Sequence, residues 1–445
     1  MNLSALSKWA TDLHVVDPPE TPKTAFFYAG KDGYYLRRED GTFIPLTTEN
    51  QVRQHLERVG VNDKSAQTAA LCRIRTEQYV KYVGPLAGWT AGVHTLEDSG
   101  GLILVTESPR IIEAREGDSA FLERVVTSML EDPTQPNQVW AFLAWLKQAR
   151  ANVKAGCRRP LPVAAFVGPR NSGKSFLIEL ARVALGGRQA NSFRAMSADT
   201  AFNHECAGAE LLVIDDVQAS RDHRARTRLA QAIKSWFFAG ALRVERKHHD
   251  VVNLRPVHAC MIAVNDEPEH VSILPAFDDS LADKLSLFSC QRGDFWGLER
   301  KAIGKLLNDQ LPGFLHFVED FTPPPELIDT RTGAAAWQHP EVLRLLQSIA
   351  NETHLAELIV QNPDVRNRCR RYGEWHGTAA ELQRLLLGSE TTRHSARELL
   401  SWPNATGTYL GRLVDAGRPG ISRGGQREGI QTWKIKIPTT PEDED

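Results

Sequence analysis

The stretch GPRNSGKS at residues 168–175 constrains the fold more than any other part of the chain. It follows the apolar run PVAAFV and opens the amphipathic stretch SFLIELARVALGG, which predicts a strand, a loop and a helix in that order. Its glycines let backbone N–H groups approach phosphates, and the N-terminus of the helix favours an anion. We therefore expect an ATP-binding loop made of Gly168, Pro169, Arg170, Asn171, Ser172, Gly173, Lys174 and Ser175. Lys174 would reach the outer phosphates, and the Ser175 hydroxyl would bind Mg²⁺.

Acidic and amide side chains are expected at the same sheet edge. The run ELLVIDD ends in Asp215 and Asp216, and the run MIAVN ends in Asn265. Because ligands gather at the carboxyl ends of parallel strands, Asp215 would join the Mg²⁺ shell and Asp216 would orient the attacking water. Asn265, which can both donate and accept, would place a water against the γ-phosphate. Apolar runs alternate with helical patterns over residues 155–310, which predicts a parallel α/β sheet in a core spanning residues 156–320.

A cationic hairpin is expected in the sequence between the strand that ends in Asp215 and the strand that ends in Asn265. Two short strand-like runs flank Arg246, Lys247, His248 and His249. Such a tip offers cations and hydrogen-bond donors to phosphates, and on the inner wall of a ring it would follow the backbone of a single strand.

Length and composition exclude several classes of protein. A chain of 445 residues with 42% hydrophobic and 24% charged residues is too long for one core and predicts two to four soluble domains. The longest strongly apolar run, at residues 139–146, is too short to span a bilayer, and no export signal is expected. The six scattered cysteines predict reduced thiols in a cytoplasmic protein with no membrane partner.

The regions on either side of the core differ in character. Residues 1–115 predict an α+β domain with a β-meander at 25–47, a helix at 49–61 and a strand at 100–108, and residues 116–155 predict two helices. The aromatic residues of the meander fit a core, although they could also stack on bases.

The C-terminal region is basic. Residues 366–436 carry 13 Lys+Arg against 6 Asp+Glu, and an acidic tail at 439–445 follows. After a helical linker at 321–371, residues 372–438 predict helices and a hairpin with a basic tip, an arrangement that suggests a winged helix. It would bind either duplex DNA or another protein. Its candidate phosphate contacts are Arg412, Arg423, Arg427 and Lys434.

Taken in order, GPRNSGKS, LLVIDD, LRVERKHHDVV and MIAVN resemble the successive motifs of superfamily 3 helicases. The likeness is to the primase-helicase kind of phages, plasmids and integrative elements, and the motor motifs are similar to those of papillomavirus and poxvirus replicative helicases. The resemblance implies an AAA+ core, ATP and Mg²⁺, a ring that is often a hexamer, and 3′ to 5′ movement on single-stranded or forked DNA during replication. It also implies that Lys247 and His248 contact the strand.

Two departures from that family stand out. The family supplies an Arg to the neighbouring subunit's site, whereas the matching stretch FDDSLADKLSLF has Lys284 there; Arg292 is the alternative. The chain also lacks a priming motif, a zinc-ligand cluster and a nicking motif, which predicts a motor alone, with priming left to a separate protein. An ATP-switched loader, initiator or anti-phage sensor without processive unwinding stays open, and a nucleotide kinase is a third reading.

Overall fold

The computed structural model describes residues 26–96, 100–215, 223–275, 277, 279–348, 351–415 and 417–437. The chain forms two compact units. The larger contains Met1–Gln218, Asp222–Asn265 and Asp279–Gln338, and the smaller contains mainly His339–Asp445. Among the helices of the described residues, none is both long enough and apolar enough to cross a membrane.

A five-stranded parallel sheet forms the centre of the larger unit. Its spatial order is β13-β7-β12-β9-β8, and every neighbouring pair runs parallel. The strands are β7 (Val163–Gly168), β8 (Gln189–Asn191), β9 (Leu211–Ile214), β12 (Ala259–Asn265) and β13 (Leu285–Ser289). All six residues of β7 are buried, as expected for a strand covered on both faces. The predicted parallel α/β sheet is confirmed.

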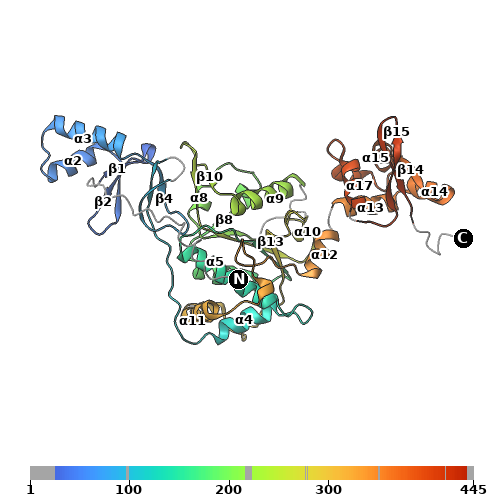
Figure 1. Cartoon of the computed structure of the whole chain (residues 1–445), viewed down its shortest axis with the longest axis horizontal. Helices are drawn as coiled ribbons and strands as arrows, with labels where there is room; N and C mark the ends of the chain where they lie inside the picture. Colours follow the sequence, from blue (N-terminus) through green and yellow to red (C-terminus); the bar gives the residue numbers. More distant parts are fainter. Residues whose placement is uncertain are drawn as a thin grey trace, which may run out of the picture. The chain divides into compact units, whose positions relative to one another are not determined.

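Helices cover both faces of this sheet (Figure 1). One face carries α4 (Ala120–Leu130), α5 (Gln138–Lys154), α6 (Lys174–Ala184) and α11 (Arg300–Asp320), which share one apolar cluster with alternate strand residues. Phe166 of β7 stacks on Phe288 of β13 inside this cluster, with ring centroids 5.0 Å apart. The other face carries α9 (His223–Phe238). The short helices are α7 (Phe193–Met196), α8 (His204–Ala207) and α10 (Pro268–Val271).

The N-terminal part of the larger unit contains two small sheets. The first is an antiparallel meander of β1 (Phe26–Tyr28), β2 (Tyr34–Arg37) and β3 (Phe43–Leu46), as its turn residues predicted. The helices α2 (Glu49–Arg58) and α3 (Lys64–Glu77) follow it, and Thr48 and Gln51 form a capping box at the start of α2. The second sheet has the order β4 (Val80–Gly84), β6 (Leu102–Val105) and β5 (Gly92–Thr95).

The second sheet packs against a hairpin of the core. The hairpin strands are β10 (Leu242–Val244) and β11 (Val252–Leu254). Their buried residues form one apolar cluster with Leu86, Ile103 and Val105 of the N-terminal part. Gly88 of the N-terminal part also packs closely against the core. A Cβ at Gly88 would lie 2.5 Å from Val257, and the Gly88 backbone N–H donates to the Glu210 side chain at 3.1 Å. The hairpin base and the N-terminal sheet therefore share a core.

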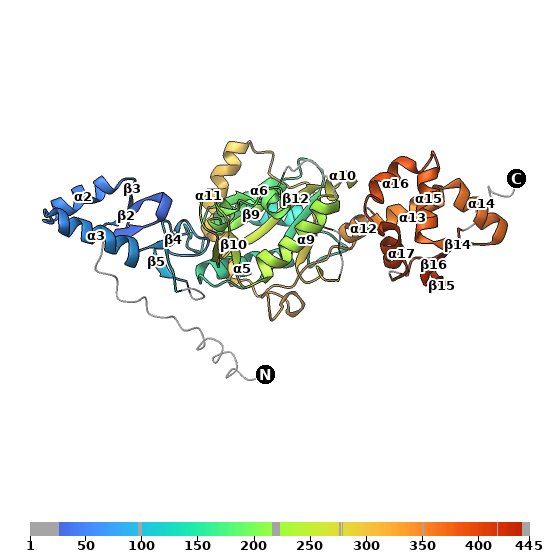
Figure 2. The same cartoon turned by 90° about the horizontal axis from the view of Figure 1, so that it is seen from above.

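The smaller unit contains the helices and strands from α13 to β16 that are labelled near the C-terminus in Figure 2. It has its own apolar core, which includes Trp375, Tyr409 and Trp433. Its strands form an antiparallel sheet in the order β14-β16-β15. The predicted helices near 378–387 and 404–417 and the predicted hairpin are present. The elements are α12 (Pro340–Ser348), α13 (Asn351–Gln361), α14 (Pro363–Tyr372), β14 (Trp375–Thr378), α15 (Ala379–Gly388), α16 (Arg393–Leu399), α17 (Ala405–Asp415), β15 (Ile421–Arg427) and β16 (Ile430–Ile435).

Candidate functional site

The glycine-rich loop joins β7 to α6 and is closed by the segment that follows β13. A methyl group on Gly168 would lie 2.2 Å from the backbone oxygen of Cys290, so only glycine fits there. Gly173 has a φ of +107°, a backbone conformation that other residues rarely adopt. The backbone N–H of Gly293 donates to the carbonyl oxygen of Ser172 at 2.8 Å. Close backbone packing therefore holds the loop in shape.

Lys174 is buried at the centre of this loop. Its side-chain nitrogen donates to the backbone oxygens of Gly168 and Pro169, each at 2.8 Å, and lies 3.3 Å from the hydroxyl of Ser172. It also donates to Oδ1 of Asn265 at the end of β12, at 3.1 Å. The structure thus brings together the loop lysine and the predicted amide, although they are far apart in sequence.

Ser175 and Asp215 also meet at this edge of the sheet. The Ser175 hydroxyl lies 3.3 Å from Oδ2 of Asp215, which directly follows β9. A hydroxyl and a carboxylate are the hard oxygen donors that Mg²⁺ prefers, so these two residues fit that ion. Since β12 lies between β7 and β9, Asn265 stands between the loop strand and the acidic strand. Asp216 lies outside the described residues.

The two candidates for a charged residue from a neighbouring subunit lie at different edges of the sheet. Lys284 directly precedes β13, and its carbonyl accepts from the N–H of Val163 at the start of β7, so it lies at the edge away from the loop. Its side chain is mostly buried, pairs with Asp283 and lies over the ring of Phe238. Arg292 is exposed and lies in the segment after β13 that closes the loop.

The cysteines offer no reactive thiolate near the loop. All six are free. Burial raises the pKa of the Cys290 thiol, beside Gly168, to about 12. Burial thus favours the protonated, unreactive form of this thiol.

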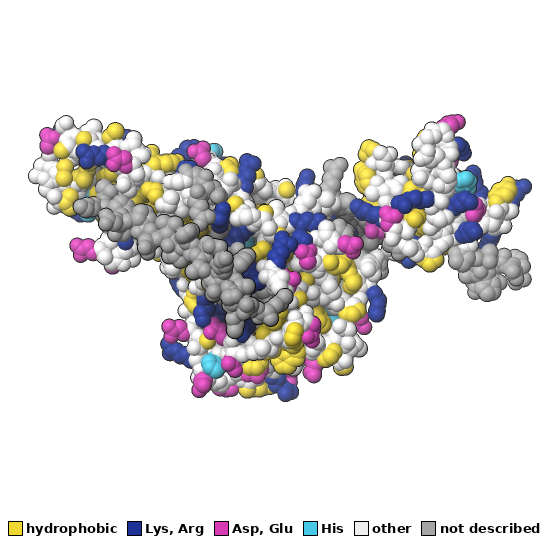
Figure 3. All heavy atoms as spheres, viewed as in Figure 1, with side chains coloured by type: hydrophobic (Ala, Val, Ile, Leu, Met, Phe, Trp, Pro, Cys, Tyr) yellow, Lys and Arg dark blue, Asp and Glu magenta, His cyan; other side chains and the backbone are white. Residues whose placement is uncertain are grey.

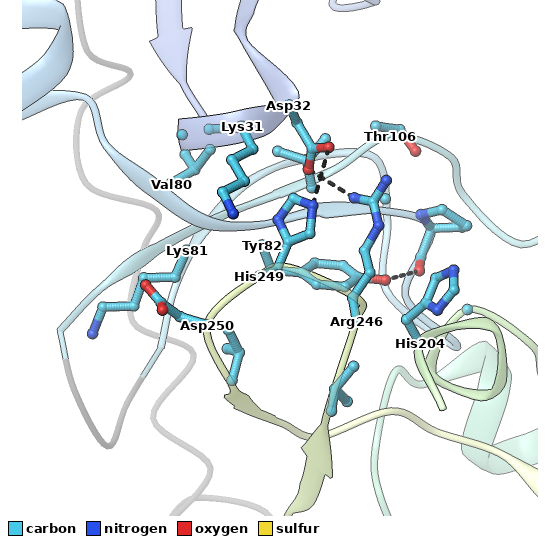
Figure 4. Close-up of a pocket in the computed structure, with 18 of the residues that line it drawn as sticks. Lys31, Asp32, Val80, Lys81, Tyr82, Thr106, His204, Arg246, His249 and Asp250 are labelled. Atoms are coloured by element: carbon cyan, nitrogen blue, oxygen red, sulfur yellow. Dashed lines mark hydrogen bonds and ion pairs between the residues drawn. The ribbon is translucent and has the colours of Figure 1, made fainter. Parts of the chain in front are cut away.

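The residues of the hairpin tip differ in whether they contact the N-terminal part of the chain, as Arg246 and His249 do beside Asp32 in Figure 4. Arg246 donates to Oδ2 of Asp32 in the N-terminal part at 2.7 Å, and Nε2 of His249 lies 3.7 Å from Oδ1 of the same carboxylate. Lys247 and His248 are exposed and have no ion-pair partner in the part of the chain that the structure describes. The four predicted tip residues are therefore not equivalent: two are engaged within the chain and two are open to a ligand.

Asn203 fixes the first strand of the hairpin. Its side-chain oxygen accepts from the N–H of Glu245 at 2.8 Å, and its side-chain nitrogen donates to the carbonyl of Arg243 at 2.9 Å. At the tip, His248 has a φ of 66°, in the left-handed region. The tip is thus a tight turn on a clamped base.

The predicted DNA contacts of the smaller unit all have acidic partners inside that unit. Lys and Arg side chains are scattered among acidic ones over the visible face of this unit (Figure 3). The pairs are Arg412–Glu352 at 3.8 Å, Arg423–Asp415 at 2.8 Å, Arg427–Glu381 at 2.5 Å and Lys434–Glu374 at 3.2 Å. The backbone N–H of Thr378, with Arg427, lowers the pKa of Glu381 to about 2. Each of these four cations therefore already has an acidic neighbour within its own unit.

Sequence reasoning did not single out two groups of cations. The run RNRCRRY places Arg368, Arg371 and the exposed Tyr372 on α14, and neither arginine has a carboxylate partner among the described residues. The density of arginines in this run was a usable signal. Lys31 and Lys81 carried no such signal, because only the fold brings them to the hairpin tip.

Comparison with known proteins found one family model and several similar solved structures. A family model described as a family of unknown function (DUF5906) matches residues 166–280. No curated protein matches the chain in sequence. The apo structure of the NrS-1 C-terminal region (305–718) is similar, with a TM-score of 0.54 and 13% identity over 93% of this chain and 96% of that chain. The A form apo structure of that region gives a TM-score of 0.53 at 12% identity with the same coverage.

A weaker likeness is to a JCV helicase in complex with a small molecule. It covers 47% of this chain and 60% of that chain at 14% identity, and its TM-score of 0.27 is too low to carry an argument. At these levels of identity, the NrS-1 structures establish a shared fold and leave activity to the site itself.

Proposed function

We propose that this protein is an ATP-dependent DNA helicase, a ring-forming translocase on single-stranded DNA of the superfamily 3 kind. This proposal depends on four side chains that meet at one edge of a parallel sheet, those of Lys174, Ser175, Asp215 and Asn265. The cationic hairpin lies in the sequence directly before the strand that ends in Asn265. A nucleotide site connected by one strand to a phosphate-binding tip suits a machine that couples hydrolysis to movement along a polyanion.

The loop residues would bind ATP through their backbone N–H groups, and Lys174 would neutralise charge that develops on the outer phosphates. Ser175 and Asp215 would hold Mg²⁺, which would supply positive charge near the phosphates. Asn265 would hold Lys174 in position and place a water against the γ-phosphate, and Asp216 would orient the attacking water. These roles use the AAA+ assignment that the motif order suggests.

On the DNA side, we assign the primary strand contact to Lys247 and His248, because they are the tip residues without an internal partner. Cationic side chains at a tight turn can follow a sugar-phosphate backbone without reading bases. We propose movement in the 3′ to 5′ direction and a role in replicating a phage, plasmid or integrative element in the cytoplasm, with priming left to a separate protein.

The placement of Lys284 favours a ring. It lies at the sheet edge away from its own phosphate loop, so a role in hydrolysis would be toward another subunit's nucleotide and would require its pair with Asp283 to open. Arg292, beside the loop of its own chain, would serve its own site instead. A homo-hexamer would repeat this contact at every boundary. The smaller unit would be a winged helix that grips duplex or forked DNA.

The test is fuel-dependent strand displacement on forked DNA, together with phosphate release with and without single-stranded DNA. Lys174→Ala should abolish hydrolysis under both conditions. Lys247→Ala with His248→Ala should remove unwinding and the stimulation of hydrolysis by single strands. Full unwinding by that double variant would contradict the assignment of the hairpin. Particle mass with an ATP analogue and single-stranded DNA should show rings, and a strictly monomeric chain would contradict the motor.

One observation favours a second function. Lys284 lacks the planar fork of an arginine and is already paired with Asp283, so its effect on a neighbour's hydrolysis should be weak. An ATP-switched loader, initiator or anti-phage sensor needs only slow hydrolysis. Stimulation of hydrolysis by DNA without strand displacement would select this function, and hydrolysis indifferent to DNA would select a nucleotide kinase.

A further inference from the structure

A cavity of about 740 Å³ lies between the hairpin tip and the N-terminal sheets, within the larger unit (Figure 4). Its volume is within the usual range of ligand sites. One wall comes from the β1–β2 turn and β4, and the other from α8 and the hairpin tip. It is separate from the phosphate loop, none of whose residues lines it.

In this cavity, the chain's own Asp32 carboxylate is bound by Arg246. The Asp32 carboxylate accepts from the guanidinium of Arg246 at 2.7 Å and lies 3.7 Å from the imidazole of His249. A guanidinium that binds a carboxylate also matches the oxygens of a phosphate. The Asp32–Arg246 pair is only partly buried, since 42% of the Arg246 side chain and 18% of the Asp32 side chain are exposed, so another anion can reach the guanidinium. A stronger anion could therefore replace Asp32.

Two further cations line the cavity without an internal partner. Lys31 and Lys81 are exposed and have no ion-pair partner in the described parts of the chain. The stem of Lys81 lies against Gly101, where an added Cβ would be 2.6 Å from the lysine Cε. Three tyrosines, Tyr35, Tyr79 and Tyr82, also line the cavity, and Tyr79 is 40% exposed. Aromatic faces beside cations are the usual elements of a single-strand site.

The remaining charges restrict what this cavity can hold. Glu205 and Asp250 also line it, so its positive charge is only partly in excess. A triphosphate would face these carboxylates with all of its charge concentrated in one group. A single-stranded nucleic acid carries one charge per nucleotide and presents bases to the tyrosines, which fits the cavity better.

We propose that this cavity is a binding site for single-stranded nucleic acid, in which a phosphodiester group replaces the Asp32 carboxylate on Arg246 and His249. Lys31 and Lys81 hold adjacent phosphates, and Tyr79 stacks on a base. The site extends the strand path from the exposed tip residues onto the N-terminal part. This inference rests on the proposed function, because it assumes that the hairpin meets DNA.

The test measures binding of the full chain to a fluorescein-labelled oligo(dT) as a function of salt. Each phosphate contact on a single strand contributes about 0.7 to the slope of log affinity against log salt concentration. Lys31→Ala with Lys81→Ala should therefore lower the magnitude of that slope by about 1.4. The matched control is Lys64→Ala, which removes an exposed lysine of the same N-terminal part, at the start of α3. A slope equal to that of the control would overturn the proposal.

Asp32→Asn gives the opposite prediction. Removing the competing carboxylate should raise the affinity for oligo(dT) about two- to fivefold. If Asp32 served only to attach the hairpin to the N-terminal part, the affinity would stay the same or fall, and the proposal would be wrong.

Photo-crosslinking locates the strand directly. Oligo(dT) containing 4-thiothymidine should crosslink to the peptide that contains Tyr79, and crosslinks confined to the hairpin tip would overturn the site. Failure of the site is distinguishable from failure of the proposed function. If the wild-type chain binds oligo(dT) while these variants behave as the control does, only the cavity assignment falls. If the wild-type chain does not bind oligo(dT), both fall.

Discussion

Replacing Asn265 by alanine should slow ATP hydrolysis without removing nucleotide binding. The side-chain oxygen of Asn265 accepts from the ammonium of Lys174 at 3.1 Å, and a hydrogen bond to a charged group is worth about 1.5–3 kcal/mol. Lys174 keeps its bonds to the carbonyls of Gly168 and Pro169, each at 2.8 Å, so the loss should lie at the low end. A loss of about 1.5–2 kcal/mol in the transition state lowers kcat about 10- to 30-fold.

The assay is steady-state phosphate release, with nucleotide affinity measured separately by fluorescence. Asn308→Ala is the matched control, because Asn308 is an exposed asparagine on α11 and lines neither the loop nor the hairpin. The reasoning predicts a lower kcat with a nucleotide affinity close to that of the control. A kcat within twofold of the control would refute the role of the Lys174–Asn265 contact. Loss of binding together with kcat would show that Asn265 supports the loop instead.

Three further predictions concern stability and DNA binding. Gly168→Ala places a methyl group 2.2 Å from the backbone oxygen of Cys290, so it should lower the free energy of unfolding by about 1–3 kcal/mol and reduce the affinity for ATP. Urea titration and nucleotide-binding measurements check this, and an unchanged urea midpoint would contradict the close packing at Gly168. Burial lowers the pKa of His258 to about 3, below its unfolded value of about 6.5, so only the unfolded chain binds a proton between these values and stability should fall as the pH drops below about 6.5, by up to about 1.4 kcal/mol per pH unit. In His258→Leu, the urea midpoints at pH 7 and pH 5 should move closer together, and a loss of stability at acid pH equal to that of the wild type would contradict the assignment. Arg368→Ala should reduce the salt dependence of duplex DNA binding more than Arg427→Ala does, because Arg427 is paired with Glu381. Fluorescence anisotropy measures this, and the reverse order would place the DNA contact on the hairpin of the smaller unit.

The residues around the glycine-rich loop could be grouped from sequence because short motifs contain them. The glycine spacing of the loop and the acids and amide at strand ends follow from local chemistry and from the geometry of parallel sheets. The contacts from Ser175 to Asp215 and from Lys174 to Asn265 agree with that reasoning. The meander at the N-terminus was also predicted, since its turns have strong local signals.

Tertiary contacts between distant residues were not accessible. All four tip residues were candidate DNA contacts, with Lys247 and His248 singled out by the resemblance, and only the fold shows that Asp32 engages Arg246 and His249. Helix α3 was missed because its polar residues give only a weak amphipathic pattern, with three buried positions in fourteen. The cations of the smaller unit were chosen by charge alone, which cannot reveal that Glu374 or Glu381 lies beside them.

The shared core of the hairpin and the N-terminal sheet has a practical consequence for anyone who shortens the chain. Leu242 and Leu254 are covered by Leu86, Ile103 and Val105, which lie far upstream of the phosphate loop. A fragment that begins at residue 156 would carry the glycine-rich loop, Asp215 and Asn265 yet leave these leucines in water, and it should aggregate or misfold. In the proposed motor, any movement of the hairpin would also move the β4–β6 sheet, because the two share one apolar core.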